Sequence, residues 1–172
     1  MIESLGSSVI ELLNSGELLE DDEWLADALD RWDLAPNRPI RPGDRDALRE
    51  LRALLQRLAI AVSKHETLPP AELAAFNEVI GATPVRAQLE LAPGGGYILD
   101  LHPLAADWFG YVVRELAGEF GSMLRLAFPP RIKLCEECGS VFWDGTRSRT
   151  RRWCDSRTCG NRVRVRRHRA RQ

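Results

Sequence analysis

Apolar residues recur at helical spacing through most of the first 127 positions of the chain. The clearest stripe lies between residues 44 and 63, where one helix face would carry Leu48, Leu51, Leu55, Leu58 and Val62. Similar patterns that stop near glycine, proline or asparagine predict further helices over residues 7–14, 18–34, 70–79 and 102–127. The first part of the chain should therefore be mainly helical.

Apolar and polar residues alternate over positions 85–91 and again over 97–101, on either side of three glycines at 94–96. A period of two predicts a strand with one buried face and one exposed face. The apolar positions are Val85, Ala87, Leu89, Leu91, Tyr97, Leu99 and Leu101. We therefore expect one β-hairpin among the helices, and the fold class α+β.

Charge divides the chain into two unlike parts, although the formal net charge of the whole is only −1. Residues 1–130 hold 11 Lys+Arg against 21 Asp+Glu, whereas residues 131–172 hold 13 against 4. Prolines at 129 and 130 mark the linker between them, at residues 128–131. This asymmetry predicts an acidic helical domain over 1–130 and a basic domain over 131–172 suited to a polyanionic partner.

No apolar run approaches the roughly 18 residues that a membrane span needs, and the first residues do not resemble a secretory signal. A cytoplasmic location is therefore expected, with no membrane partner. All four cysteines lie within 25 residues of one another, and the first 134 residues have none. In a reducing compartment such a cluster indicates metal binding rather than disulfides.

The cysteines follow the pattern Cys135-x2-Cys138-x15-Cys154-x4-Cys159, the general layout of a four-cysteine structural zinc site. A hairpin of residues 140–143 with 151–153 could return the second pair to the first, and a helix could open at Cys159. A knuckle, a hairpin and a helix in this order are typical of a small treble-clef-like finger. We expect one structural Zn(II) per chain, since four thiolates leave no open coordination position for catalysis. Disulfides or four free thiols are the alternatives.

Arginines crowd this C-terminal part, and the planar guanidinium pairs well with phosphate and with guanine edges. We expect nucleic acid, DNA rather than RNA, as the partner. A solvated tail, or an arm docked on the acidic body, is the alternative, and Trp143 and Trp153 could brace the finger or stack on bases. The candidate nucleic-acid-binding residues are Arg147, Arg149, Arg151, Arg152, Arg157, Asn161, Arg162, Arg164, Arg166, Arg167, Arg169 and Arg171.

The run Cys159-Gly160-Asn161-Arg162, with the cysteines before it, resembles the CGNR zinc finger. The first helix, which ends in Leu13-Asn14-Ser15, the helix over residues 48–55 that contains Leu51-Arg52, and the hairpin before the last helix resemble the ABATE domain. This domain usually precedes the finger in proteins assigned to bacterial transcription regulation. The resemblance implies a zinc-dependent transcription regulator and no enzymatic activity. An adaptor that uses the finger to bind protein is the alternative. A nuclease is a weaker one, because the finger lacks the adjacent histidines that would hold a catalytic metal.

The body shows no catalytic constellation, and its histidines are scattered. Glu119 falls within the apolar stripe of the last predicted helix, where it would either sit at the edge of the stripe or face a pocket. In the second case it would pair with Arg52 or Asn77 and bind a small effector. The candidate effector pocket comprises Asn14, Arg52, Asn77 and Glu119. A homodimer is a further candidate assembly, although no heptad repeat requires it.

Overall fold

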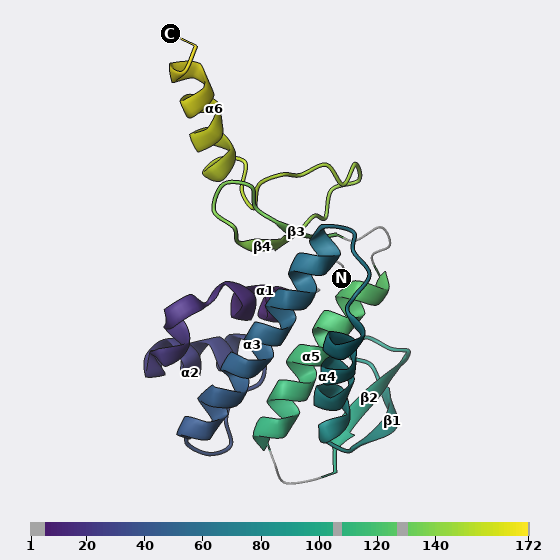
Figure 1. Cartoon of the computed structure of the whole chain (residues 1–172). Helices are drawn as coiled ribbons and strands as arrows, with labels where there is room; N and C mark the ends of the chain where they lie inside the picture. Colours follow the sequence, from purple (N-terminus) through teal and green to yellow (C-terminus); the bar gives the residue numbers. More distant parts are fainter. Residues whose placement is uncertain (1–5, 105–107, 127–130, 172) are drawn as a thin grey trace.

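The computed structural model describes residues 6–104, 108–126 and 131–171. Its N-terminal part is mainly helical, as predicted (Figure 1). The elements of this part are α1 (Ser7–Asn14), the short 3-10 helix η1 (Gly16–Glu20), α2 (Asp22–Arg31), α3 (Pro42–Ser63), α4 (Pro70–Ala82), β1 (Val85–Leu91), β2 (Tyr97–Pro103) and α5 (Trp108–Leu126).

The body packs around the long helices α3 and α5. The predicted stripe of α3 is buried, and α5 contributes Val112, Phe120 and Met123, none of which has exposed surface. Phe76 of α4 packs edge-on against Phe120. Burial of these side chains is the main favourable contribution to folding of the body. No helix within the described ranges has both the length and the apolarity to cross a membrane.

The single helix predicted over 18–34 is in fact two elements that meet at Asp21. Its backbone is extended, with φ −85° and ψ 119°, and its side chain accepts a hydrogen bond of 3.0 Å from the backbone N–H of Trp24. Aspartate is a favoured N-cap because its carboxylate satisfies an N–H that lacks an intrahelical partner. The cap therefore ends η1 and starts α2, a break that apolar spacing alone does not reveal.

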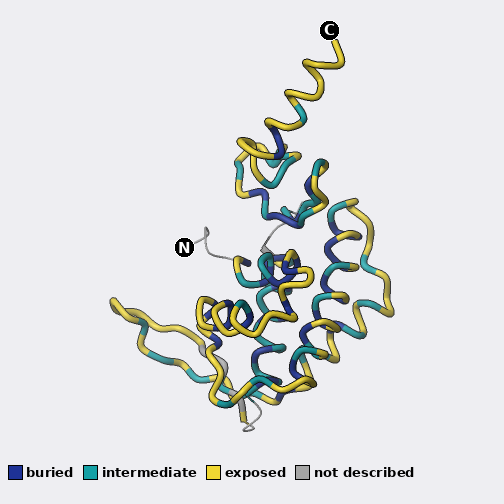
Figure 2. The backbone as a smooth tube through the Cα atoms, turned by 90° about the vertical axis from the view of Figure 1, so that its left-hand side faces the viewer, coloured by how far each residue is buried: buried dark blue, intermediate teal, exposed yellow. Residues whose placement is uncertain are grey.

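The predicted hairpin is present, and β1 and β2 are antiparallel with Leu89 opposite Leu99. Two details of the prediction were wrong. The strand β2 continues through His102 and Pro103, so these residues do not start the last helix. The apolar face is not buried either, because Leu89 and Leu99 are each 69% exposed. The hairpin extends outward from the helices (Figure 2).

The C-terminal part holds a second, smaller antiparallel hairpin and one helix. Strand β3 (Ile132–Leu134) pairs with β4 (Val141–Trp143), and α6 (Cys159–Arg169) follows. The predicted pairing of residues 140–143 with 151–153 was wrong, since β4 pairs with the strand before the first cysteine. Ile132 and Val141 are buried in the core of the body, where β3 packs against α3 and β4 against α1. The predicted linker prolines lie outside the described residues.

Candidate metal centre and nucleic-acid interface

The first two cysteines occupy the tight turn that joins β3 to β4. The backbone N–H of Cys135 donates to the carbonyl of Ser140 at 2.8 Å, and that of Gly139 donates to the carbonyl of Cys135 at 2.9 Å. Gly139 has φ +77°, a conformation in which a side chain is strained. The turn therefore holds both thiols on the same side of the hairpin, as the glycine after Cys138 predicts.

The second pair is held at the start of α6. Cys159 is its first residue and is buried. Cys154 lies five residues earlier, before the turn that leads into α6. Asp155 stabilises this turn, because its carboxylate accepts the backbone N–H of Thr158 at 3.0 Å. Trp153 packs over Gly160 so closely that a β-carbon there would lie 3.2 Å from its ring. This contact supports a bracing role for Trp153.

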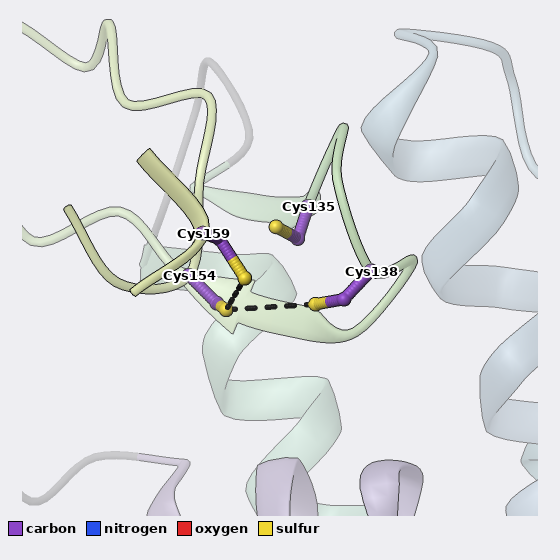
Figure 3. Close-up of side chains that lie close together, drawn as sticks. All are labelled: Cys135, Cys138, Cys154 and Cys159. Carbon is purple, nitrogen blue, oxygen red and sulfur yellow. Dashed lines mark hydrogen bonds between the residues drawn. The ribbon is translucent and has the colours of Figure 1, made fainter. Parts of the chain in front are cut away.

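The four sulfur atoms converge on one point (Figure 3). All four lie within 4.8 Å of one another, and Sγ of Cys154 is 3.7 Å from Sγ of both Cys138 and Cys159. A tetrahedron with Zn–S bonds of about 2.3 Å has S–S edges of about 3.8 Å. The sulfurs are therefore spaced for one shared zinc ion, and none of the four is in a disulfide. They would hold a structural zinc.

The thiols themselves differ in acidity. Hydrogen bonds with the side chain and the backbone of Ser140 lower the pKa of the Cys138 thiol to about 6. Burial, with the neighbouring sulfurs, raises the pKa of Cys154 to about 12. Four thiolates packed this closely repel one another, and a divalent cation at their centre removes that penalty.

Asp144 organises the loop that follows β4, and nothing in the sequence analysis singled it out. Its side chain is fully buried and accepts hydrogen bonds from Lys133 Nζ at 2.7 Å, Thr146 Oγ1 at 2.6 Å and the backbone N–H of Arg151 at 3.0 Å. Burial alone would raise its pKa, but these hydrogen bonds outweigh that effect and hold the pKa at about 2. The Asp-Gly-Thr turn after a strand was the one available signal.

Asp144 thereby fixes the loop that carries the first group of predicted arginines. The guanidinium of Arg151 lies over the ring of Phe142 and donates to the carbonyl of Cys154. The guanidinium of Arg152 forms a bidentate ion pair with the carboxylate of Glu136 and lies over the ring of Trp153. Both side chains are therefore held in place by the finger itself. Arg147 is exposed, and Arg149 is half-buried.

The second group of arginines lies on α6, which leaves the finger and extends away from the body (Figure 1). Only Cys159 and Gly160 are buried in this helix. Arg166 pairs with Glu137, and Arg164 donates to the carbonyl of Ser156 at 3.0 Å, so both partners belong to the finger. Within the part of the chain that the structure describes, no hydrogen bond or ion pair engages the guanidinium groups of Arg147, Arg162, Arg169 and Arg171.

Each acidic side chain of the finger forms an ion pair or a hydrogen bond with another residue of the finger. Glu136, Glu137 and Asp144 pair with basic side chains, and Asp155 caps the turn before α6. The remaining positive charge is thus directed outward. An exposed surface of arginines attracts phosphate and is screened by salt.

The four candidate effector residues lie on four different helices, α1, α3, α4 and α5. Asn14 contacts the finger, where its side chain meets the backbone of Val141. Asn77 is exposed on α4. Arg52 is half-buried on α3, and its Nε is buried without a hydrogen-bond partner among the described residues.

Glu119 lines a cavity of about 320 Å³ with Ser8, Trp32, Asp33, Leu34, Tyr111, Glu115 and Leu116. Its carboxylate accepts the backbone N–H groups of Gly6 at 2.7 Å and Val9 at 3.3 Å. Glu119 therefore caps α1 from another helix. Burial raises its pKa, although these backbone hydrogen bonds act in the opposite direction.

Comparison with protein families divides the chain in two. Residues 131–172 match the model of the CGNR zinc finger. Residues 6–117 match the model of the ABATE family, described as "Putative stress-induced transcription regulator". No curated protein matches the chain.

Proposed function

Because the chain belongs to the ABATE family and ends in a CGNR zinc finger, we propose that it is a zinc-dependent, DNA-binding transcription regulator of the bacterial cytoplasm. Both families are of regulator and zinc-finger type, not of enzymes. The finger is the nucleic-acid-binding part in this proposal. The ABATE body is the regulatory part.

The exposure of α6 is the observation that carries the proposal. The helix begins at the metal site, is rich in arginine and projects into solvent over nearly its whole length (Figure 2). An α-helix with its side chains is about 10–12 Å across, and the major groove of B-DNA is about 12 Å wide. The deep, narrow major groove of double-stranded RNA does not admit such a helix. This difference favours DNA.

The loop after β4 would contact the DNA backbone in the same complex. Arg147 and Arg149 lie on it, and hydrogen bonds to Asp144 fix its shape. Contacts of this kind set position, whereas contacts in the groove read sequence. Arg162, Asn161 and Arg164, in the first turns of α6, are the side chains that we assign to base edges.

The body could transmit a signal from a small effector to the finger. Glu119 lines the cavity and caps the N-terminus of α1, while Asn14 at the other end of α1 contacts β4. A ligand that displaced Glu119 would remove its hydrogen bonds to the start of α1. The position of α1 would then change, and with it the contact between Asn14 and β4 of the finger. We assign the effector site to this cavity. Of the four effector residues predicted from the sequence, the proposed site retains only Glu119.

The proposal is tested by a salt titration of zinc-loaded protein against duplex DNA. Removal of one arginine that touches a phosphate should reduce the salt slope by about 1. We expect Arg167→Ala/Arg169→Ala, at exposed positions of α6 that we do not assign to base edges, to weaken binding and to reduce the slope by about 2. The matched control is Arg86→Ala/Arg125→Ala, which removes the same charge from exposed positions of the body. Equal effects of the two pairs would contradict the assignment to α6.

Two other outcomes would favour the alternative functions. Binding to a protein, with no salt-sensitive binding to any nucleic acid, would indicate an adaptor. Cleavage of DNA in the presence of added Mg²⁺ would indicate a nuclease. Tighter binding to RNA than to DNA would retain the finger as the interface and overturn the groove assignment.

A further inference from the structure

One face of the hairpin β1–β2 exposes an apolar patch to solvent. Leu89, Leu91 and Leu99 are 69%, 72% and 69% exposed, and Tyr97 is 75% exposed. The strand register places them together, since Leu89 lies opposite Leu99 and Leu91 lies opposite Tyr97. We call these four residues the hairpin patch. Contiguous apolar surface of this kind on a folded chain commonly marks an interaction site.

The hairpin exposes its apolar face and partly buries its polar face, the reverse of an ordinary half-buried sheet. On its other face Gln88, Glu90 and His102 are half-buried, and His102 Nε2 lies 2.7 Å from Glu90 Oε1. These three polar residues are thus more protected than the leucines of the patch, although Arg86 and Ile98 on the same face are exposed. Sequence alternation predicts a strand that buries its apolar face. A partner that covers the patch would restore that arrangement.

We propose that the hairpin patch binds the same patch of a second copy of this chain, related by a two-fold axis. In such an interface each copy contributes the same surface, so the surface need only complement itself. The patch contains no charged side chain, and therefore neither copy presents a charge that the other would leave unpaired. Two sheets stacked face to face lie about 10 Å apart, which suits leucine side chains from both.

The strand register supplies a specific fit between the two copies. Leu91 and Tyr97 form a bulky pair near the turn, and Leu89 and Leu99 form the middle pair. Ala87, next to them on β1, is small and exposed. Ala87 lies opposite Leu101 in the register, so an axis through the middle pair and perpendicular to the strands would set Leu91 of one copy over Ala87 of the other. At that position a large side chain meets a small one, which is how packed layers avoid voids.

The size of the patch defines how tight the dimer should be. An aromatic side chain offers about 150–250 Å² and a leucine somewhat less, so the four largely exposed residues present roughly 500 Å² per copy. Standard stable interfaces remove about 800 Å² per partner from solvent. Two patches together give about 1,000 Å², which is at the lower limit for a specific interface and in the range of weak, transient ones. We therefore infer a dimer that forms and dissociates at micromolar concentration.

The position of the patch is compatible with the proposed DNA contact but does not depend on it. The hairpin lies beside α4 and α5, at the opposite end of the molecule from the tip of α6 (Figure 1). Pairing through the patch would leave both basic helices free. Two-fold DNA readers use this arrangement to contact two half-sites.

Sedimentation velocity of the full zinc-loaded chain, without DNA, tests the proposal. We expect the mass to rise from 19.4 kDa towards twice that value between about 1 and about 100 µM. Leu99→Asp should keep the chain monomeric over this range, because the new carboxylate would lose its water on pairing. Leu91→Asp provides a second variant with the same expectation. The matched control is Leu18→Asp on η1, where the leucine is 48% exposed and outside the patch.

Circular dichroism and zinc content should be the same for the wild type and all three variants. A wild-type chain that stays monomeric at about 100 µM would overturn the proposal. So would a dimer that survives Leu99→Asp, or one that Leu18→Asp disrupts equally. Loss of DNA binding alone would contradict the proposed function and leave this dimer unaffected.

Discussion

Asn14, the last residue of α1, is joined to Val141 of β4 by two hydrogen bonds. Its Nδ2 donates to the carbonyl of Val141 at 2.8 Å, and its Oδ1 accepts the backbone N–H of Val141 at 2.9 Å. The side-chain amide thus pairs with the free edge of the strand as a neighbouring strand would. This pair, together with the buried side chains of Ile132 and Val141, fixes the finger to the body.

We expect Asn14→Ala to loosen the finger without displacing zinc. Two hydrogen bonds of this kind contribute about 1–3 kcal/mol together. Hydrogen exchange at Val141 should become about 5- to 150-fold faster, while the core of α5 is unchanged. Asn77→Ala, at an exposed asparagine of α4, is the control. Equal exchange in the wild type and in Asn14→Ala would show that apolar packing alone holds the finger.

The sequence was sufficient to predict most helices and the metal site, for a physical reason. A stripe such as that of α3 is read along one local segment, and cysteine spacing is constrained by the geometry of a single ion. The exposed hairpin face, the pairing of Asn14 and the burial of Asp144 depend on which distant segments meet. Asn14 and Val141 are 127 positions apart. No local pattern carries that information.

Zinc removal should unfold α6 and leave the helices of the body intact. The helix has 11 residues, of which only Cys159 and Gly160 are buried, and isolated helices shorter than about 12–15 residues are marginal in water. The strands β3 and β4 should remain, because Ile132 and Val141 are buried in the core of the body. A chelator should therefore lower the helical circular dichroism only in part.

Cys159→Ser should reproduce the effect of the chelator, whereas Ser140→Ala should retain zinc. The release of one zinc ion per chain can be followed with a metal-sensitive dye. Cooperative loss of the whole helical signal on chelation would show that the finger and the body unfold as one unit. An unchanged signal would show that α6 does not require the metal.

Asp144→Asn should disorder the arginine loop while the zinc site remains. The substitution keeps the shape of the side chain but removes the charge that pairs with Lys133 Nζ. Breaking a buried pair in this way costs about 2–4 kcal/mol. We expect faster hydrogen exchange over residues 144–153 and weaker DNA binding at unchanged zinc content. Glu136→Gln, which breaks an exposed ion pair with Arg152, should cost less than about 1 kcal/mol.

The pH dependence of Asp144 gives a separate check. Its pKa is about 2 in the folded chain and 3.8 ordinarily. The folded state therefore binds this proton more weakly, and the stabilisation is complete above pH 3.8 and is lost as the pH falls through about 2. The difference in the free energy of unfolding between the wild type and Asp144→Asn should be constant from neutral pH down to about pH 3.8. A difference that disappears between pH 7 and 5 would contradict the assigned hydrogen bonds.

Glu119 should show the opposite pH dependence. Burial raises its pKa above 4.5, so the folded state binds the proton more tightly than the unfolded chain. Its favourable contribution is then complete below pH 4.5 and is lost as the pH rises through the folded-state pKa. Glu119→Gln keeps an oxygen that can accept the backbone N–H of Gly6 and has no charge to bury. The variant should therefore gain stability relative to the wild type as the pH rises.

Urea unfolding at pH 4.5 and at about pH 8 measures this difference, with Glu78→Gln at an exposed position of α4 as the control. The free energy of unfolding of Glu119→Gln should exceed that of the wild type by more at the higher pH. If the wild type instead gains on the variant as the pH rises, the N-terminus of α1 stabilises the carboxylate by more than burial costs. Glu119 would then serve as a charged cap of α1.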